Sequence, residues 1–92
     1  MDVKILEREE DKVRMVLKGE GHTFMNALVE EILTDLSVDV ARYEIKYQFS
    51  DPELLVTTHG GKDSVTVILE ACARLTAQCD EILAQTRAQT AA

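Results

Sequence analysis

The sequence predicts an α+β fold in which a four-stranded, mainly antiparallel sheet carries two helices on one face. Two observations predict it. Some segments alternate apolar and polar residues, which is the period of a half-buried strand, and others repeat apolar residues every three or four positions, which is the period of a helix. The segments follow the order β-β-α-β-β-α, and a chain of 92 residues has room for one core. We therefore expect a single domain over residues 1–84 and a polar, frayed C-terminal tail at residues 85–92.

The first two strands are expected on either side of a charged run. Residues 3–7 mix apolar and charged side chains, and residues 12–18 alternate apolar side chains with Lys and Arg. Every residue of the run at 7–11 is charged, so the run cannot be buried. It is therefore expected at the exposed tip of a hairpin.

A first helix is expected over residues 22–36, after the break at residues 19–21. One apolar row recurs at four-residue steps: Phe24, Leu28, Ile32 and Leu36. A second row runs beside it: Met25, Val29 and Leu33. His22 or Thr23 is expected to cap the first turn. Because the apolar arc is wider than one sheet contact requires, two surfaces are expected to cover it, and the sequence leaves open which row faces which.

The third and fourth strands follow from the clearest alternation in the chain. The apolar members of the third strand are Ala41, Tyr43, Ile45, Tyr47 and Phe49. A turn at Asp51-Pro52 separates it from a fourth strand at residues 53–59, which Gly60-Gly61 closes. A second hairpin is therefore expected.

The last element is expected to be a long helix from about Ser64 to at least Leu83, capped by Asp63 or Ser64. Its apolar positions alternate steps of three and four residues: Val65, Ile68, Cys72, Leu75, Cys79 and Ile82. This is the spacing of a coiled-coil seam, and the helix is longer than one face of a four-stranded sheet can cover. The pattern therefore predicts a partner helix.

Charge and composition argue against several classes of function. The 17 acidic residues outnumber the 10 basic ones, and the net charge of -7 repels phosphate, so direct binding of nucleic acid is not expected. Residues 1–18 do not resemble a targeting signal, and nowhere do about 18 apolar residues run together, so we expect a soluble, cytoplasmic protein. The two cysteines lie seven positions apart on one predicted helix, too far for a disulfide.

The chain offers little for catalysis or for a cofactor. The polar candidates stand at element boundaries and form no recognisable catalytic, metal-binding or phosphate-binding motif: Glu20, His22, His59 and Asp63. The surplus apolar helix surface is the stronger indication, and it points to association with another chain. The alternative is that both helix rows simply pack on each other and on the sheet.

Residues 19–28, GEGHTFMNAL, resemble the G-E-x-H-T-x-x-N-x-L signature of the small α-like subunits of RNA polymerases, which include archaeal subunit L and its relatives in eukaryotic nuclear polymerases. The resemblance covers residues 3–83. It includes Ala41-x-Tyr43-x-Ile45 and the run from Pro52 to Thr58. One departure stands out, because members of this family usually carry His-Pro soon after the third strand, where this chain has KYQF at residues 46–49. A longer third strand is expected there instead.

The resemblance implies a non-catalytic assembly subunit of an archaeal DNA-dependent RNA polymerase, without a cofactor of its own. It would pair with the larger α-like subunit, which is designated D in archaea, and nucleate assembly of the other small platform subunits and the large catalytic subunits for transcription. The implied partner interface comprises Phe24, Leu28, Ile32, Leu36, Val65, Ile68, Cys72, Leu75, Cys79 and Ile82. The resemblance also implies that the family motif at the helix start holds the turn entering the first helix and contacts a large subunit; its residues are Glu20, His22, Thr23 and Asn26.

Two other hypotheses stay open at this point. A stand-alone homodimeric α+β binding or regulatory module would bury the same helix faces on a second copy of itself. A small enzyme would use His22 with Glu20 or Asp63, and it would require a pocket that the sequence does not indicate.

Overall fold

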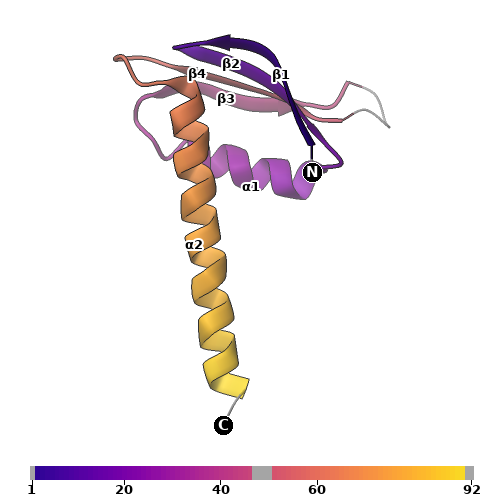
Figure 1. The fold of residues 1–92 in the computed structure, drawn as a ribbon, viewed down its shortest axis with the longest axis vertical. Coiled ribbons are helices and arrows are strands. Elements are labelled where there is room, and N and C mark those ends of the chain that lie inside the picture. Colours follow the sequence, from indigo (N-terminus) through magenta and orange to yellow (C-terminus); the bar gives the residue numbers. More distant parts are fainter. Residues whose placement is uncertain (1, 47–50, 91–92) are drawn as a thin grey trace.

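The structure is a computed structural model that describes residues 2–46 and 51–90 (Figure 1). Its elements, in chain order, are β1 (Asp2–Glu9), β2 (Lys12–Lys18), α1 (His22–Ile32), β3 (Val38–Glu44), β4 (Glu53–Thr58) and α2 (Ser64–Thr90). The predicted order of elements and the α+β fold class are confirmed.

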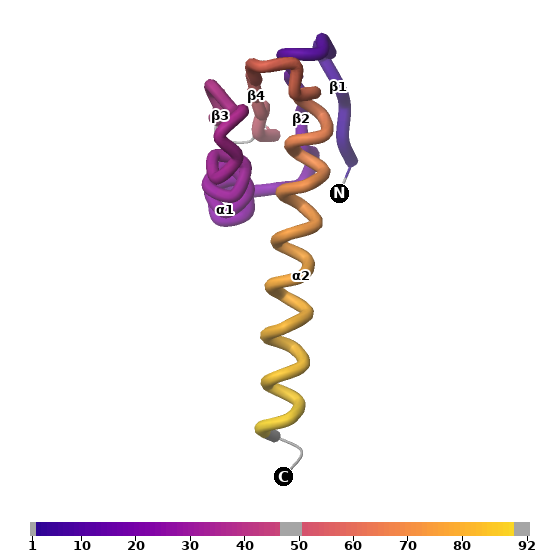
Figure 2. Tube along the Cα trace, turned by 90° about the vertical axis from the view of Figure 1, so that its left-hand side faces the viewer, coloured from indigo at the N-terminus to yellow at the C-terminus, as the bar shows by residue number. Residues whose placement is uncertain are grey.

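The four strands form one sheet in the order β1-β2-β4-β3, and all three neighbouring pairs are antiparallel. Both helices lie on the same face of it. α1 packs against β3 and α2 against β2 and β4, so that α2 lies between α1 and β1 when the molecule is viewed along the strands (Figure 2). Neither helix covers β1, and every residue of that strand is exposed.

The core lies between the helices and the inner face of the sheet. The strands contribute Val13, Met15, Leu17, Leu54 and Val56. The helices contribute Met25, Leu28, Ile32, Val67, Ile68 and Ala71. Burying a side chain of the size of Leu or Met contributes about 1.5–3 kcal/mol, which gives a small domain a real but modest core.

α1 ends four residues before Leu36, where the sequence predicted its end. The amide and the hydroxyl of Thr34 both donate to the carbonyl oxygen of Glu31, at 3.2 and 2.7 Å. Asp35 Oδ1 then accepts from the Ser37 amide at 2.8 Å. Short polar side chains that bond their own backbone compete with the helical ladder. The predicted extension was therefore wrong, and residues 33–36 form turns.

β3 begins at Val38 and ends at Glu44, so it starts and finishes earlier than the pattern predicted. It ends where its partner begins, because Glu44 pairs with Glu53, the first residue of β4, and Pro52 before it has no amide hydrogen to extend the ladder. The longer strand expected in place of His-Pro does not form at residues 45–46. Tyr47 and Phe49 lie outside the described residues.

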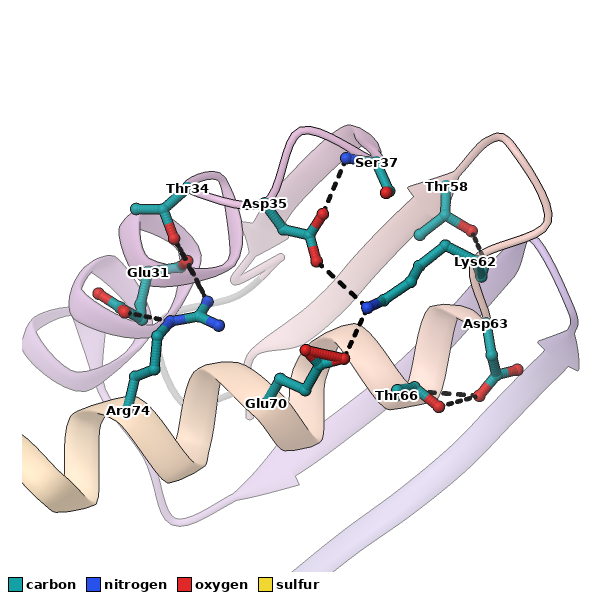
Figure 3. Close-up of polar contacts among 10 residues, drawn as sticks. All are labelled: Glu31, Thr34, Asp35, Ser37, Thr58, Lys62, Asp63, Thr66, Glu70 and Arg74. Carbon is teal, nitrogen blue, oxygen red and sulfur yellow. Dashed lines mark hydrogen bonds and ion pairs between the residues drawn. The ribbon is translucent and has the colours of Figure 1, made fainter.

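α2 is capped by Asp63, as one of the two alternatives predicted. Asp63 Oδ2 accepts from both the amide and the hydroxyl of Thr66, each at 3.0 Å (Figure 3). These bonds lower the pKa of the Asp63 carboxyl below its ordinary value, since they favour the charged form. Ser64 instead ties the helix to the tip of the first hairpin, its hydroxyl donating to the Glu9 carbonyl at 3.0 Å and its amide to the Glu10 carbonyl at 2.7 Å.

The predicted extent of the last helix, to at least Leu83, agrees with the structure. α2 continues past Leu83 as a helix to Thr90. The frayed tail expected at residues 85–92 stays a prediction about the end of the chain in solution.

Candidate partner interface

The motif at the start of α1 is built around Tyr43 of β3. The N-cap position is Gly21, which makes no side-chain cap hydrogen bond, so the prediction that His22 or Thr23 caps the helix was wrong. His22 Nδ1 instead lies 2.8 Å from the Tyr43 hydroxyl, which donates to Asn26 Oδ1 at 3.2 Å. Because the hydroxyl hydrogen goes to Asn26, His22 acts as the donor through Nδ1–H.

This network joins the first turn of α1 to the sheet. The rings of His22 and Tyr43 also pack against each other, with centroids 5.6 Å apart and planes at 58°. Glu20 is half-buried and Thr23 is exposed, and neither side chain takes part in the network. Two of the four motif residues are thus brought together by the fold, and the histidine serves as a tether.

The ten residues expected at a partner interface divide into three groups. The residues that are buried in this chain's own core are Leu28, Ile32 and Ile68. Those that are half-buried against it are Phe24, Val65 and Leu75. Those left exposed are Leu36, Cys72, Cys79 and Ile82. Leu36, at 92% exposure, lies in the turns after α1 and not on a helix face.

α2 leaves the body of the molecule after its first three turns. The helix has 27 residues, which is about 40 Å at 1.5 Å per residue. Every side chain from Thr76 to Gln89 is exposed, and the longest dimension of the molecule, 50 Å, lies along this helix (Figure 1). We call residues 76–90 the outer half of α2.

An apolar hollow of about 330 Å³ lies where α2 separates from α1. We call it the recess, and its lining comprises Phe24, Cys72, Leu75, Thr76 and Cys79. Ile82 and Leu83, which are 67% and 48% exposed, follow one turn further along α2. The seam predicted from the sequence therefore starts against the core at Val65 and Ile68, passes through the recess and ends on the projecting helix.

The sequence did not single out β1 as part of this surface. Val3 and Ile5 pair with Leu17 and Met15, whose side chains are buried on the helix side of the sheet, yet Val3 and Ile5 are 54% and 50% exposed because neither helix reaches them. The i, i+2 spacing of the two residues was the available signal, but spacing alone does not show how far the helices extend.

The chemistry of the recess is that of a contact surface. Its described lining carries no carboxylate, imidazole or ammonium group, and burial raises the pKa of the Cys72 thiol, which keeps that thiol protonated. Over residues 2–46 and 51–90, no group of His, Cys, Asp or Glu side chains could hold a metal ion. In the same part of the chain neither helix is long and apolar enough to cross a membrane.

The family model of the RNA polymerase Rpb3/Rpb11 dimerisation domain matches residues 12–85. The chain belongs to this family. Its relatives include subunit Rpo11 of DNA-directed RNA polymerase from Methanocella arvoryzae, 39% identical over 84 residues with 90% of each chain covered. Rpo11 from Archaeoglobus fulgidus is 40% identical over 86 residues, with 92% of this chain and 99% of the relative covered.

A solved structure agrees with these sequence relatives. The crystal structure of DNA-directed RNA polymerase subunit L from Thermoplasma acidophilum superposes with a TM-score of 0.85 at 27% identity, covering 96% of this chain and 87% of that one. Family membership makes this chain a small, non-catalytic α-like subunit of an archaeal DNA-directed RNA polymerase. The resemblance seen in the motif, and the transcription role it implied, are confirmed.

Proposed function

We propose that the chain forms a heterodimer with the larger α-like subunit of its polymerase, and that this partner covers the recess and the outer half of α2. The observation that carries this proposal is the apolar row that continues along α2 beyond Leu75, where every side chain from Thr76 to Gln89 is exposed. Cys79 and Ile82 extend the row over the next two turns. Exposed apolar rows of this length mark protein–protein contacts in soluble proteins.

The surface draws apolar side chains from several elements, as a stable interface does. A standard interface buries about 800 Å² on each partner. The outer half of α2, the recess and the uncovered inner face of β1 lie on the helix side of one molecule, and together they offer apolar side chains from several elements: Val3, Ile5, Phe24, Cys72, Leu75, Cys79, Ile82 and Leu83. At about 25 cal/mol per Å², covering them would also stabilise a small core.

The heterodimer would then serve as the assembly platform for the other small subunits and the large catalytic subunits, in the cytoplasm where an archaeal polymerase transcribes. Glu20 and Thr23 support a contact with a large subunit, because they lie at the start of α1 outside the network of Tyr43. The chain's net charge of -7 supports a place on the platform away from nucleic acid.

The test uses paired glutamate substitutions on opposite sides of the outer half of α2. Cys79→Glu with Ile82→Glu places two charges in the apolar row, whereas Ala77→Glu with Ala84→Glu places two charges on exposed positions that lie about 140° to 160° around the helix from those two row positions, at 100° per residue. Each variant is expressed with the larger α-like subunit from the same organism and examined by native mass spectrometry. We expect one-to-one heterodimers with the wild-type and alanine-site variants and loss of the heterodimer with the row variant.

The two cysteines give an independent readout on the wild-type chain. Cys72 and Cys79 are the only cysteines, both are exposed, and both line the recess. The larger α-like subunit should therefore slow their alkylation by iodoacetamide at least tenfold, as counted on peptides of this chain. Undiminished alkylation in a one-to-one complex would place the interface elsewhere, and a homodimer that excludes the larger α-like subunit would contradict the proposal altogether.

A further inference from the structure

A network of charged side chains joins the end of α1 and the turn after it to the first turns of α2 (Figure 3). Arg74 Nε donates to Glu31 Oε1 at 2.6 Å. One terminal nitrogen of Arg74 also donates to the Glu31 carbonyl oxygen at 3.0 Å and to Thr34 Oγ1 at 3.3 Å. The guanidinium thus covers the C-terminal end of α1, where unpaired carbonyls carry partial negative charge. We call this set of contacts the Arg74 clamp.

Lys62 makes a second connection at the same junction. Its Nζ lies 2.6 Å from Glu70 Oε1 on α2 and 3.8 Å from Asp35 Oδ2 in the turn after α1. The hydrogen bond to Glu70 raises the pKa of the Lys62 ammonium above its ordinary value. The loop before α2, the first turns of α2 and the end of α1 are therefore held together by two cations.

Arg74 stands just before the point where the side chains of α2 become exposed. The side chains before it that face the sheet are Val67, Ile68 and Ala71, which are buried, while residues 76–89 are all exposed. The outer half of α2 is a lever of about 20 Å, so a rotation of about 10° at Arg74 moves its end by roughly 3–4 Å.

The apolar contacts alone constrain this angle weakly. Hydrophobic burial is not directional, and Ala71, the buried residue closest to Arg74 on α2, has only a methyl group to interlock with its neighbours. A guanidinium that meets a carboxylate, a carbonyl and a hydroxyl at once fixes direction as well as distance.

We infer that Arg74 is a positioning residue for partner binding: its clamp on Glu31 and Thr34 holds the outer half of α2 at one angle, so that the recess is formed before the larger α-like subunit arrives. Binding to a preformed surface avoids the cost of ordering it. The inference rests on the proposed function, because it takes the recess as the surface that the partner covers.

The first test measures the angle in the free chain. Spin labels at Gln89→Cys on α2 and Thr57→Cys on β4, in a chain with Cys72→Ser and Cys79→Ser, report the distance between the helix end and the sheet. We expect one narrow distance distribution with Arg74 present and a broad one with Arg74→Met, which keeps the side chain's length and loses its charge and donors. A distribution that stays narrow in Arg74→Met would overturn the inference.

The second test measures affinity for the larger α-like subunit with native cysteines. We expect Arg74→Met to weaken binding about tenfold, mainly through slower association. The affinity of Arg74→Lys should lie between those of the wild-type chain and Arg74→Met, because lysine restores the charge but lacks the planar set of donors of the guanidinium. Arg42→Met is the matched control. Arg42 is exposed on the outer face of β3, makes no ion pair with the described residues, and should leave affinity within about twofold.

The choice of temperature distinguishes a loss of folded protein from a loss of positioning by Arg74. Binding is measured where circular dichroism shows each variant to be fully folded, so a loss of affinity there is not a loss of folded protein. If the wild-type chain binds the larger α-like subunit and Arg74→Met binds equally well, the clamp is not a positioning device while the proposed function stands. If the wild-type chain does not bind that partner at all, the proposed function fails and the inference fails with it.

Discussion

At the scale of single residues, His22 shows that a histidine in a sequence motif can be a candidate for catalysis and yet have a structural role. His22 and Asn26 are four positions apart, which is about one turn of helix, so their side chains reach the same Tyr43 hydroxyl. Two hydrogen bonds and a ring contact then fasten α1 to β3. The spacing of four places His22 and Asn26 on one helix face, but Tyr43 lies 17 positions beyond Asn26 and only the fold brings it there.

This network should behave as one unit in stability measurements. Tyr43→Phe removes both hydrogen bonds and should lower the free energy of unfolding by about 1 kcal/mol, a typical net value for such bonds. His22→Ala should lower the free energy of unfolding by a similar amount. The double variant should lower it by less than the sum of the two single changes, because the two residues share one interaction. Urea unfolding of the four proteins measures this. Strict additivity would show that the contact contributes nothing in solution.

Asp63 predicts a pH dependence of a definite sign. Its pKa is lowered in the folded chain from an ordinary value of 3.8, so its contribution to stability is complete above that value and is lost as the pH falls through the lower, folded pKa. Asn caps a helix equally well and does not titrate. The stability advantage of the wild-type chain over Asp63→Asn should therefore shrink between about pH 5 and pH 2, as followed by urea unfolding across that range. Asp35, whose pKa is also lowered, is present in both proteins and cancels.

At the scale of elements, periodicity predicted the type and order of all six elements, because alternation and helical spacing are local properties. It was wrong about where α1 ends, because Thr34 and Asp35 satisfy their own backbone there. It could not divide the partner-interface set, because apolar spacing looks the same whether the neighbour is the chain's own sheet, as at Ile68, or solvent, as at Ile82.

The outer half of α2 predicts a specific pattern of hydrogen exchange. In the free chain the amides of residues 78–90 should exchange at least a hundredfold faster than those at Val67, Ile68 and Ala71, because the side chains of residues 78–89 are exposed whereas those three are buried in the core. With the larger α-like subunit bound, protection should rise for the turns around Cys79 and Ile82 and stay low at the last few residues, where fraying is expected. Equal protection along α2 in the free chain would mean that the projecting part is stable without a partner.

At the scale of the whole molecule, the surface is divided by function around α2. The Arg74 clamp joins α2 to the C-terminal end of α1, while the recess, which Phe24 at the start of α1 helps to line, is apolar. The uncovered inner face of β1 extends the apolar surface beyond α2, at Val3 and Ile5. In the proposed heterodimer, one edge strand and one projecting helix would face the same partner.

This arrangement predicts that the chain's stability depends on its partner. A ligand that binds only the folded state adds RT ln(1 + [L]/Kd) to the free energy of unfolding, which is about 2.7 kcal/mol when the larger α-like subunit is present at about a hundred times its Kd. For a domain of this size about 1 kcal/mol corresponds to roughly 4–8 °C, so the melting temperature should rise by at least about 10 °C. The row variant Cys79→Glu with Ile82→Glu should melt close to the free wild-type chain and gain nothing from the partner, because its changes lie on exposed positions. A row variant that melts far below the wild-type chain would show instead that these residues stabilise the chain's own fold.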